Sequence, residues 1–535
     1  MNNIKFGKNV IENLTSGMYQ DSRIIYREYI QNSADQIDKA LAQKIYSDPK
    51  DAYIDIKIDQ KKRSVSICDN ATGIKSEQVH TELANVADSQ KKRGEDKGFR
   101  GIGRLGGLAY CEKLRFTTSY LGEPVATIME WDASKCIDII NDNSNNCDAE
   151  SLLHEIISYS EQECTEDKHF FKVELINIKK ESKDLLNISQ IKRYISETAP
   201  VPYSNSMLYD QKIYNYIDNN SIDLDEYKIY VNGDIVVKPY SSDLYNEVGG
   251  KREIYDQIFD LEFCEIKTQE NEPLAWLWYG ISTFEKQIPN KHNQMRGLRL
   301  RKDNIQIGTS DALINLFKEQ RGVFYFIGEV QAIHPQLIPN GRRDYFNENE
   351  IRSEFEAELK SFFDTKLSNL YNSSSKIRSS YKKISEHTLA KKTWDEKQTT
   401  GFLSDKEESE LKAKVDKTKK EAKKNEKSIK RWEDKAKDDA TLKKILDKIK
   451  AKQHEKVDKP PKRNNKSGSH KKKKQPKKKP IYIANELTHL TRNERKIVSK
   501  IYSIISDNLD EKNSESLIRT IQKELKNNGK KDSAN

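Results

Sequence analysis

Residues 27–40 read Arg-Glu-Tyr-Ile-Gln-Asn-Ser-Ala-Asp-Gln-Ile-Asp-Lys-Ala, and this stretch decides how the N-terminal part of the chain folds. The spacing predicts a helix on which Glu28, Asn32 and Asp35 share one face, because they stand at positions i, i+4 and i+7. An apolar stripe beside them would bury this helix: Ile30, Ala34, Ile37 and Leu41. A carboxylate and an amide on a buried helix are costly unless a ligand uses them. An ordinary helix with a polar outer face has the same pattern, so the choice between a ligand site and a solvent-exposed face depends on the segments that follow.

Mg-ATP is a ligand that would use both groups. The amide oxygen of Asn32 can ligate magnesium, and the carboxylate of Glu28 can orient and deprotonate an attacking water. Asp35 can instead hold the helix in place through hydrogen bonds. The helix therefore predicts a nucleotide site if later segments provide contacts to the base and to the phosphates.

Contacts to the base are expected at the end of a β-hairpin. Residues 53–58 and 65–68 alternate as two strands, and the second strand runs into Asp69-Asn70-Ala71-Thr72-Gly73. The carboxylate of Asp69 can accept a hydrogen bond from an exocyclic amine such as that of adenine, and Gly73 permits close approach of the backbone to a flat ligand. A simple Asn/Gly turn would contain the same residues.

Contacts to the phosphates are expected from a glycine-rich loop, residues 98–108, which reads Gly-Phe-Arg-Gly-Ile-Gly-Arg-Leu-Gly-Gly-Leu. Gly98, Gly101 and Gly103 suit a loop whose backbone amides fold over phosphates, and residues 105–110 would then offer a helix N-terminus to the anion. The loop is neither a Walker motif, because no Gly-Lys-Ser/Thr closes it, nor a Rossmann turn, because no strand leads directly into it.

In this order, the three motifs resemble the N-box, G1 and G2 boxes of the GHKL superfamily, which groups DNA gyrase B, heat-shock-protein-90 chaperones, histidine kinases and MutL. Residues 27–39 are closest to the chaperone version of the N-box. The resemblance implies a Bergerat-fold α/β sandwich ATPase domain over residues 1–205, which binds ATP and Mg²⁺. It also implies the role of each residue: Glu28 as general base, Asn32 as magnesium ligand, Asp35 in the nucleotide site, Asp69 as adenine anchor beside Gly73, Asn85 in the pocket lining, and Gly98, Gly101 and Gly103 as the phosphate lid.

The sequence departs from the family on the adenine side. The family usually carries a Gly-Thr pair on a later strand, and the best match, residues 169–175, offers Phe171 at the threonine position. A water or Thr165 would have to substitute for that hydroxyl.

A second α/β domain, similar to the ribosomal-S5-like transducer domain of these ATPases, is expected over residues 206–375. Strands are predicted at 227–237, 274–283 and 298–307, and helices at 310–318 and 350–370. Lys302 and Arg343 match cations that reach the γ-phosphate across the domain boundary in chaperone and MutL-like ATPases, so the resemblance implies catalytic roles for both. As isolated residues they would equally be solvated surface cations.

The rest of the chain differs in composition, and the fold class expected for the whole is α+β. Residues 380–458 predict a charged helical or coiled-coil region, 459–480 a basic disordered linker, and 481–535 a small helical module. Residues 381–535 hold 45 Lys/Arg against 25 Asp/Glu, whereas residues 1–380 hold 49 against 59. A basic tail on an acidic body attracts polyanions such as nucleic acid or an acidic partner, and it would also serve as a solvated tether.

The six cysteines are scattered without a Cys-x-x-Cys pair, which indicates reduced thiols rather than a disulfide framework or a zinc site. No run of eighteen apolar residues appears. The sequence therefore predicts a soluble cytoplasmic protein without a membrane partner.

These observations lead to an expected function. The chain would bind and hydrolyse Mg-ATP as a heat-shock-protein-90-like conformational switch, chaperone-like, in which nucleotide drives N-terminal dimerisation of a homodimer that acts on a client protein. The alternative is a MutL- or MORC-like DNA-binding ATPase clamp, in DNA processing or anti-phage defence, which would contact DNA through the basic tail.

Overall fold

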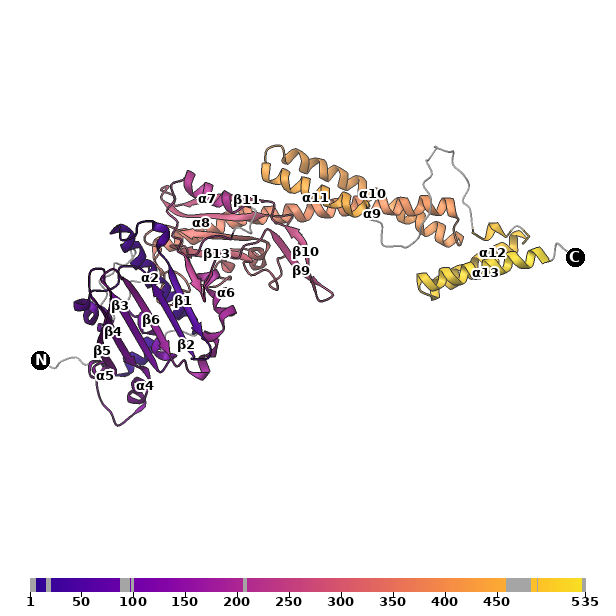
Figure 1. The fold of residues 1–535 in the computed structure, drawn as a ribbon. Helices are drawn as coiled ribbons and strands as arrows, with labels where there is room; N and C mark the ends of the chain where they lie inside the picture. Colours follow the sequence, from indigo (N-terminus) through magenta and orange to yellow (C-terminus); the bar gives the residue numbers. More distant parts are fainter. Residues whose placement is uncertain are drawn as a thin grey trace. The chain divides into compact units, whose positions relative to one another are not determined.

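The computed structural model describes residues 6–15, 21–86, 97, 101–204, 209–458, 483–487 and 489–531. The chain divides into two compact units, Met1–Asn369 and Leu370–Asn535 (Figure 1). Secondary structure is mixed, with two main sheets in the first unit and long helices in the second. The α+β class predicted from the sequence is therefore confirmed.

An eight-stranded sheet organises the N-terminal part of the first unit. Its strand order is β5-β4-β3-β6-β2-β1-β7-β8, and every neighbouring pair is antiparallel except β1 with β7. The predicted hairpin at 53–68 is confirmed by the β1–β2 pair, and β3 and β4 form a second hairpin. The strands are β1 (Ile54–Asp59), β2 (Ser64–Asp69), β3 (Lys113–Ser119), β4 (Val125–Asp132), β5 (Ile157–Glu163), β6 (Phe170–Ile176), β7 (Ile229–Val231) and β8 (Asp234–Ile235).

Helices pack on this sheet because alternate strand residues are apolar. Ile54, Ile56 and Ile58 of β1 are buried, and they belong to one apolar core with Ile30 and Ala34 of the helix α2. The predicted helix start at 105–110 is wrong in type, because residues 103–109 form a 3₁₀ helix whose repeated glycines disfavour an α-helix. The helical elements are α1 (Asn9–Thr15), α2 (Ile24–Ala42), η1 (Pro49–Asp51), η2 (Ser76–Gln78), α3 (Val79–Ala84), η3 (Gly103–Ala109), α4 (Ala133–Asn141), α5 (Ala149–Ile156), η4 (Lys180–Leu186) and α6 (Ile188–Thr198).

The first sheet extends past residue 205, where the sequence suggested that the first domain ends. Strand β7 pairs in parallel with β1, with Ile54 opposite Ile229 and Ile56 opposite Val231. Val231 is fully buried in the same core as β1. Residues 229–235 lie beyond the predicted boundary at 205, and they nevertheless contribute two strands to the sheet on which α2 packs.

A second, five-stranded sheet follows in the first unit, in the order β11-β12-β15-β13-β14, beside the β9–β10 hairpin. Trp276 and Trp278 of its strand β12 are buried in an apolar core. The elements are α7 (Asp210–Asn219), β9 (Asp243–Val248), β10 (Lys251–Gln257), β11 (Asp260–Lys267), β12 (Pro273–Ile281), β13 (Gly297–Lys302), β14 (Ile305–Gln306), η5 (Ile314–Leu316), η6 (Gln320–Tyr325), β15 (Ile327–Ala332) and α8 (Glu350–Phe362).

Three predictions beyond residue 205 are wrong. The strand expected over 227–237 is the β7–β8 hairpin, because Asn232 and Gly233 adopt left-handed backbone angles. The strand expected over 298–307 is a hairpin of β13 and β14, because Asp303 and Asn304 adopt left-handed backbone angles, with φ of 52° and 54°. The helix expected over 310–318 is reduced to the short η5, because Leu313 and Phe317 are drawn into the core and tertiary packing overrides the local pattern.

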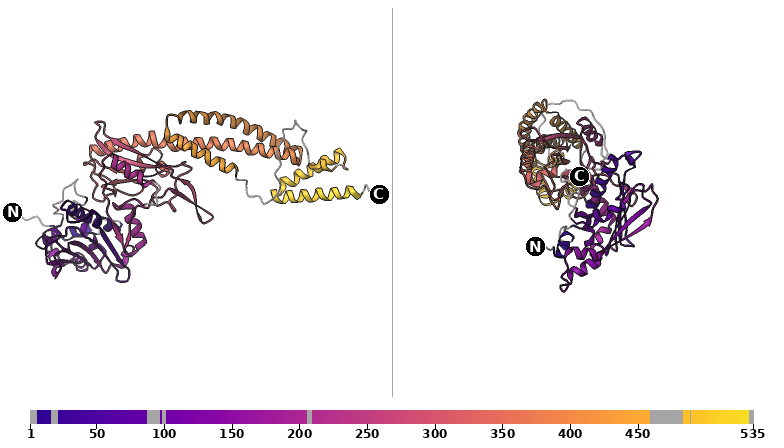
Figure 2. Two further views of the ribbon diagram at one scale, coloured as in Figure 1. Left: turned by 45° about the horizontal axis from the view of Figure 1, so that its top comes forward. Right: turned by 90° about the vertical axis from the view of Figure 1, so that its left-hand side faces the viewer.

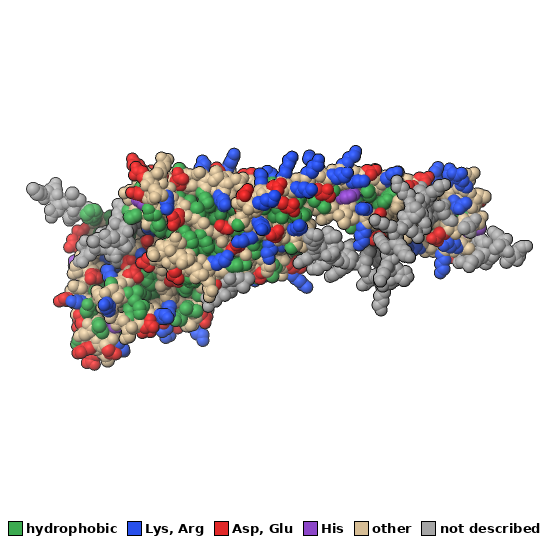
Figure 3. Space-filling view, turned by 90° about the horizontal axis from the view of Figure 1, so that it is seen from above, with side chains coloured by type: hydrophobic (Ala, Val, Ile, Leu, Met, Phe, Trp, Pro, Cys, Tyr) green, Lys and Arg blue, Asp and Glu red, His purple; other side chains and the backbone are tan. Residues whose placement is uncertain are grey.

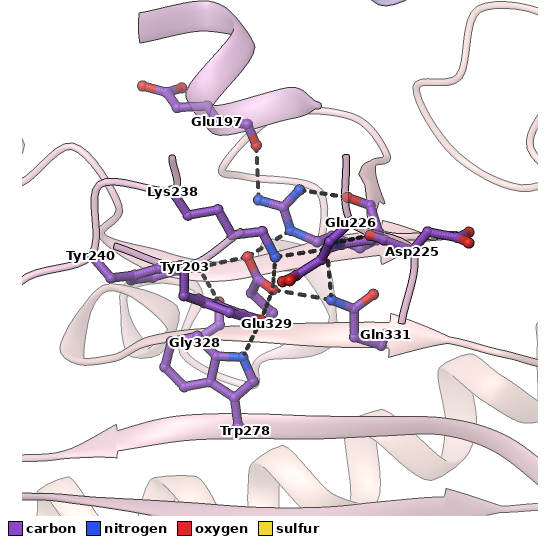
Figure 4. A network of polar contacts seen from close by, with 12 residues as sticks. Glu197, Tyr203, Asp225, Glu226, Lys238, Tyr240, Trp278, Gly328, Glu329 and Gln331 are labelled. Atoms are coloured by element: carbon purple, nitrogen blue, oxygen red, sulfur yellow. Dashed lines mark hydrogen bonds and ion pairs between the residues drawn. The ribbon is translucent and has the colours of Figure 1, made fainter. Parts of the chain in front are cut away.

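A buried polar network joins α6 and the segment after β8 to the second sheet of the first unit (Figure 4). Glu329 of β15 is completely buried and accepts hydrogen bonds from Arg301 Nε at 2.6 Å and Lys238 Nζ at 2.9 Å. Arg301 also donates to the carbonyl of Glu197 in α6, at 2.9 Å. Burial alone would raise the pKa of Glu329, but Arg301 and Lys238 outweigh it and hold that pKa well below its ordinary value.

The second unit is helical. Figures 1 and 2 show α9 (Ser368–Thr400), α10 (Asp405–Lys435) and α11 (Ala440–Asp458) running alongside one another. Lys383 of α9 pairs with Glu421 of α10 at 3.1 Å, and Lys397 with Glu407 at 2.9 Å, so these two helices are antiparallel. Figure 3 shows lysine and arginine side chains dense over this part of the chain, with acidic side chains between them.

The predicted boundary at 380 falls inside α9, which continues from α8 through the π-helical turn η7 (Phe363–Leu367). The predicted pair of C-terminal helices is present as α12 (Arg492–Asn508) and α13 (Glu511–Lys531), after the short η8 (Ile483–Glu486). The predicted basic linker, 459–480, lies outside the described residues. Among the described helices, none combines the length and apolarity needed to cross a membrane, and all six cysteines are free thiols.

Candidate functional site

The polar face of α2 is partly withdrawn from solvent. Ile30, Ala34 and Ile37 form the buried stripe predicted from the sequence. Asp35 is only 4% exposed, and the side chain of Glu28 keeps 14% of its surface exposed. Helix periodicity therefore places Glu28, Asn32 and Asp35 on one face at the edge of the core, where a ligand can reach them.

Gly103 lies directly against the carboxylate of Glu28. A Cβ built on Gly103 would lie 2.6 Å from Glu28 Oε2, so only glycine permits this approach. The hydroxyl of Tyr29 accepts from the Gly107 amide at 3.1 Å and donates to the Arg104 carbonyl at 3.0 Å, which fixes η3 on α2. The C-terminal part of the predicted phosphate loop, which begins at Gly103, is thus held beside the predicted general base Glu28.

The rest of the predicted loop is described in part. Gly101 has a φ of 68°, in the left-handed region that favours glycine. Gly98 lies outside the described residues. The carbonyl of Asn85 accepts a hydrogen bond from Arg104, so Asn85 is held next to the start of η3.

Asp69 ends β2 as a completely buried carboxyl group. Its Oδ1 accepts from the Ala71 amide at 3.1 Å, whereas its buried Oδ2 has no hydrogen-bond partner within the described part of the chain. Burial raises the pKa of Asp69 to about 7, although the neighbouring Ser33 hydroxyl and the Ala71 amide act in the opposite direction. A buried, unsatisfied acceptor is costly and is suited to a ligand that donates an N–H.

Gly73 brings the segment after Asp69 close to β3. Its φ is 67°, and a Cβ would lie 1.9 Å from the Ser119 carbonyl oxygen, so no other residue fits. The next amide, of Ile74, donates to Thr118 Oγ1 at 2.8 Å. The fold itself therefore requires glycine here through Ser119, whereas the close approach to a flat ligand expected from the sequence stays a prediction.

Thr165 does not take the place of the adenine-side threonine that the family carries. Phe171 stands opposite Asp69 in the β2–β6 pair and stacks on Phe116, with ring centroids 5.9 Å apart. Thr165 interacts instead with the exposed Asp167. The hydroxyl of Ser33 interacts with the adenine-anchor candidate Asp69, and the sequence interpretation overlooked Ser33 although it follows Asn32 directly.

Lys97, which was not singled out in the sequence, joins the loop to three acidic residues. Its Nζ lies 2.6 Å from Asp38 and 3.2 Å from Asp225, and its backbone amide donates to Asp35 Oδ1 at 2.9 Å. Burial lowers the pKa of Lys97, but Asp225 and Asp38 outweigh it and raise the pKa above its ordinary value. Asp35 therefore holds the backbone next to Gly98, the supporting role considered for it from the sequence.

Arg343 reaches this site from the second sheet's side of the first unit. It is 7% exposed, donates to the Lys97 carbonyl, and has a left-handed φ of 55°. Burial lowers its pKa, and the nearby charge of Glu28 opposes that shift. Strained backbone of this kind often marks functional residues.

Lys302 is placed differently from Arg343. Its Nζ donates to the carbonyls of Ile333 and His334, both at 3.2 Å. Within the described residues, these are the hydrogen bonds of its ammonium group, and neither leads to α2. The structure thus brings Arg343 to the predicted site but holds Lys302 against its own domain.

The donor set suits magnesium only in combination with phosphates. No group of three or more His, Cys, Asp or Glu side chains that could hold a metal occurs among the described residues. Asn32 and the neighbouring Glu28 fit an ion that takes most of its ligands from nucleotide oxygens and water. The buried Oδ2 of Asp69, which has no hydrogen-bond partner among the described residues, fits a nucleotide base that donates an N–H.

Comparison with known proteins agrees with this geometry. Residues 22–170 match the family model described as "Histidine kinase-, DNA gyrase B-, and HSP90-like ATPase". The chaperone protein HtpG of Buchnera aphidicola is 27% identical over 144 residues, which is 24% of this chain and 23% of that protein. HtpG of Halalkalibacterium halodurans is 26% identical over 131 residues, 22% of this chain and 21% of the relative.

A longer alignment exists with HtpG of Francisella tularensis, which is 23% identical over 269 residues, 46% of this chain and 36% of the relative. The chain therefore spans well under half the length of each of these relatives. The match covers α2, the Asp69 turn, the glycine-rich loop and most of the first sheet.

Proposed function

Because residues 22–170 form a GHKL-type, heat-shock-protein-90-like ATPase domain, we propose that this protein binds and hydrolyses Mg-ATP and uses the cycle as a chaperone-like conformational switch. The observation that supports the proposal most strongly is the pairing of two features at one site. Among the described residues, Asp69 keeps a buried acceptor without a hydrogen-bond partner, and Glu28 stands directly against Gly103.

Each residue then has a chemical task. Asp69 accepts a hydrogen bond from the adenine amine, and Asn32 holds magnesium together with the phosphates. Glu28 takes a proton from water as the water oxygen bonds to the γ-phosphorus, and the bond from that phosphorus to the bridging oxygen of ADP breaks. Magnesium, when bound, neutralises developing phosphate charge.

Cations from the second domain complete the site in this proposal. Arg343 is already next to Lys97 and within the electrostatic reach of Glu28, which supports a role in stabilising the transferred phosphoryl group. Lys302 has the weaker support, because it would first have to release the carbonyls of Ile333 and His334.

The proposal is tested by Glu28→Ala in the full-length chain, with Glu77→Ala as a control, since Glu77 is an exposed carboxylate outside the site. Loss of a general base lowers the hydrolysis rate by about 10²–10⁴-fold. We expect Glu28→Ala to keep its ATP affinity in calorimetry and to lose phosphate release. A parental rate in Glu28→Ala would remove Glu28 from the chemistry, and the absence of ATP binding in the parent protein would overturn the proposal as a whole.

Nucleotide-driven N-terminal dimerisation and a protein client are part of the proposal and follow the likeness to HtpG. Analytical ultracentrifugation with and without a non-hydrolysable ATP analogue tests the dimer, which should appear only with nucleotide. A monomer under both conditions would contradict a dimerising switch.

A MutL- or MORC-like DNA clamp is the second candidate, and one observation favours it. Residues 459–480 contain eleven Lys/Arg and no acidic residue, and such a segment binds phosphates through counterion release. Deleting 459–480 should abolish a DNA gel shift that weakens steeply between about 50 and 200 mM salt. No shift by the parent protein at low salt would exclude the clamp and favour the chaperone-like function.

A further inference from the structure

A cleft of about 690 Å³ in the first unit has seven arginines among its lining residues. One wall comes from the start of α2 and from α6, and the other from the β13–β14 region and the turn at 342–344. Its volume lies in the range of small-molecule sites. The arginines are Arg23, Arg27, Arg193, Arg296, Arg299, Arg342 and Arg343.

The acidic residues of the cleft are too few to neutralise these arginines. The described residues that line the cleft include seven arginines and three acidic residues, which are Asp21, Glu197 and Asp344. Four positive charges are therefore in excess. Asp21 is engaged by Arg23 at 2.7 Å, and Glu197 by Arg193 at 3.0 Å. The excess is therefore carried largely by arginines on the second wall.

Two of the arginines are buried with an unsatisfied donor. Arg299 is 4% exposed, and its Nε has no hydrogen-bond partner among the described residues. Arg343 is 7% exposed, and the same is true of its Nη1. A buried guanidinium N–H without an acceptor is costly, so both positions are suited to an anion that enters the cleft.

Arginine also determines which anion fits. Its planar guanidinium donates two parallel hydrogen bonds to phosphate, and no lysine occurs among the described residues that line the cleft, where it would bind as a point charge. A single phosphate would neutralise at most two of the four excess charges. Amide and hydroxyl groups of Gln190, Asn290 and Thr309 add neutral hydrogen-bonding groups around the arginines.

We propose that this cleft is a second anion site, separate from the nucleotide site on the polar face of α2, and that it binds a compact ligand carrying two or more phosphate groups. The ligand bridges α6 and the second-domain turn. Because Arg27 and Arg343 line the cleft and also flank Glu28, occupancy changes the rate of ATP hydrolysis. This regulatory consequence rests on the proposed ATPase function, whereas the binding itself does not.

Binding is measured by calorimetry with inorganic tripolyphosphate on the full-length protein saturated with ADP, so that the nucleotide site is already filled. The test variant is Arg193→Gln/Arg342→Gln, one arginine from each wall. The side chain of Arg342 makes no hydrogen bond or ion pair within the described residues, and Arg193 is 59% exposed, so the fold should be kept. Arg252→Gln, an exposed arginine of β10 outside the cleft, is the matched control.

We expect the parent and Arg252→Gln to bind tripolyphosphate equally and the double variant to bind it at least tenfold more weakly, with an unchanged melting temperature. Arg299→Lys should also weaken binding, because lysine lacks the Nε donor that Arg299 keeps without a partner among the described residues. Three results would overturn the proposal: no binding, binding that ADP abolishes, or binding that persists in the double variant, as expected if residues 459–480 hold the anion. A short DNA duplex that binds through Arg193 and Arg342 where tripolyphosphate does not would replace the compact ligand with a nucleic-acid backbone.

Discussion

Replacing Gly103 with alanine should separate the placement of Glu28 from nucleotide binding. A Cβ on residue 103 would lie 2.6 Å from Glu28 Oε2, and ordinary van der Waals contact begins at 3.4 Å, so the carboxylate has to move by about 0.8 Å. The clashing atom is the end of a flexible side chain, which can rotate away at little cost to the fold. The position of the carboxylate is nevertheless what proton abstraction requires.

The size of the effect follows from that displacement. A misplacement of about 1 Å typically costs about 10²-fold in rate, and complete loss of a general base about 10²–10⁴-fold. Gly103→Ala should therefore lower kcat by about 10- to 100-fold, less than Glu28→Ala does. The free energy of unfolding should change by no more than about 1 kcal/mol, because alanine also reduces the entropy of the unfolded chain.

Steady-state phosphate release, ADP calorimetry and urea denaturation together make the test. Gly7→Ala is the matched control, since a Cβ at Gly7 meets no atom within 4 Å. The reasoning is refuted by a parental kcat in Gly103→Ala. A loss of ADP affinity as large as the loss of rate would also refute it, because the substitution would then act on binding rather than on the position of Glu28.

Three further predictions concern individual charges. Asp69 has a pKa raised to about 7 and is protonated below that pH, so ADP affinity should fall by up to tenfold per pH unit below 7. Calorimetry should find this pH dependence weakened in Asp69→Asn. Equal ADP affinities of the parent protein at pH 6 and pH 8 would contradict the prediction. Arg343→Ala should slow hydrolysis by about 10²–10³-fold with unchanged ADP affinity, and Lys302→Ala should slow it less; the reverse order in a phosphate-release assay would assign the γ-phosphate contact to Lys302. Glu329→Gln should lower the free energy of unfolding by about 3–5 kcal/mol, because Arg301 stays buried without its anion. In the same guanidinium denaturation experiment, the control Glu265→Gln, at an exposed position of β11, should lower it by about 1 kcal/mol or less. Equal denaturation midpoints for the two variants would contradict the prediction.

The parts of the site that the sequence predicted depend on local patterns. The stripe of Ile30, Ala34 and Ile37 follows helix periodicity, so it fixes which face of α2 is buried and which face carries Glu28. Gly73 was noted from its place after the strand-end Asp69, but the close approach that requires glycine is to Ser119, 46 positions away in the sequence. Helix periodicity, in contrast, is determined by near neighbours in the chain and can be inferred without the fold.

The parts that were missed depend on contacts between distant residues. Lys97 has no motif of its own, and its role comes from Asp38 and Asp225, which are 59 and 128 positions away in the sequence. Lys302 matched a family loop, yet the carbonyls it contacts belong to residues 333 and 334. The arginine-lined cleft draws its residues from positions 21–344, so no window of sequence contains it.

The parallel pairing of β7 with β1 has a practical consequence for studies of the nucleotide-binding part in isolation. A fragment that stops at residue 205 lacks β7 and β8, and β1 then becomes a bare edge strand whose amides and carbonyls are free beside buried isoleucines. Unprotected edges of this kind pair with other chains and lead to aggregation. A fragment that continues through Val236, whose amide donates to the Ile229 carbonyl, keeps the edge of β1 covered. We therefore expect a fragment to need residues up to Val236 to avoid this aggregation.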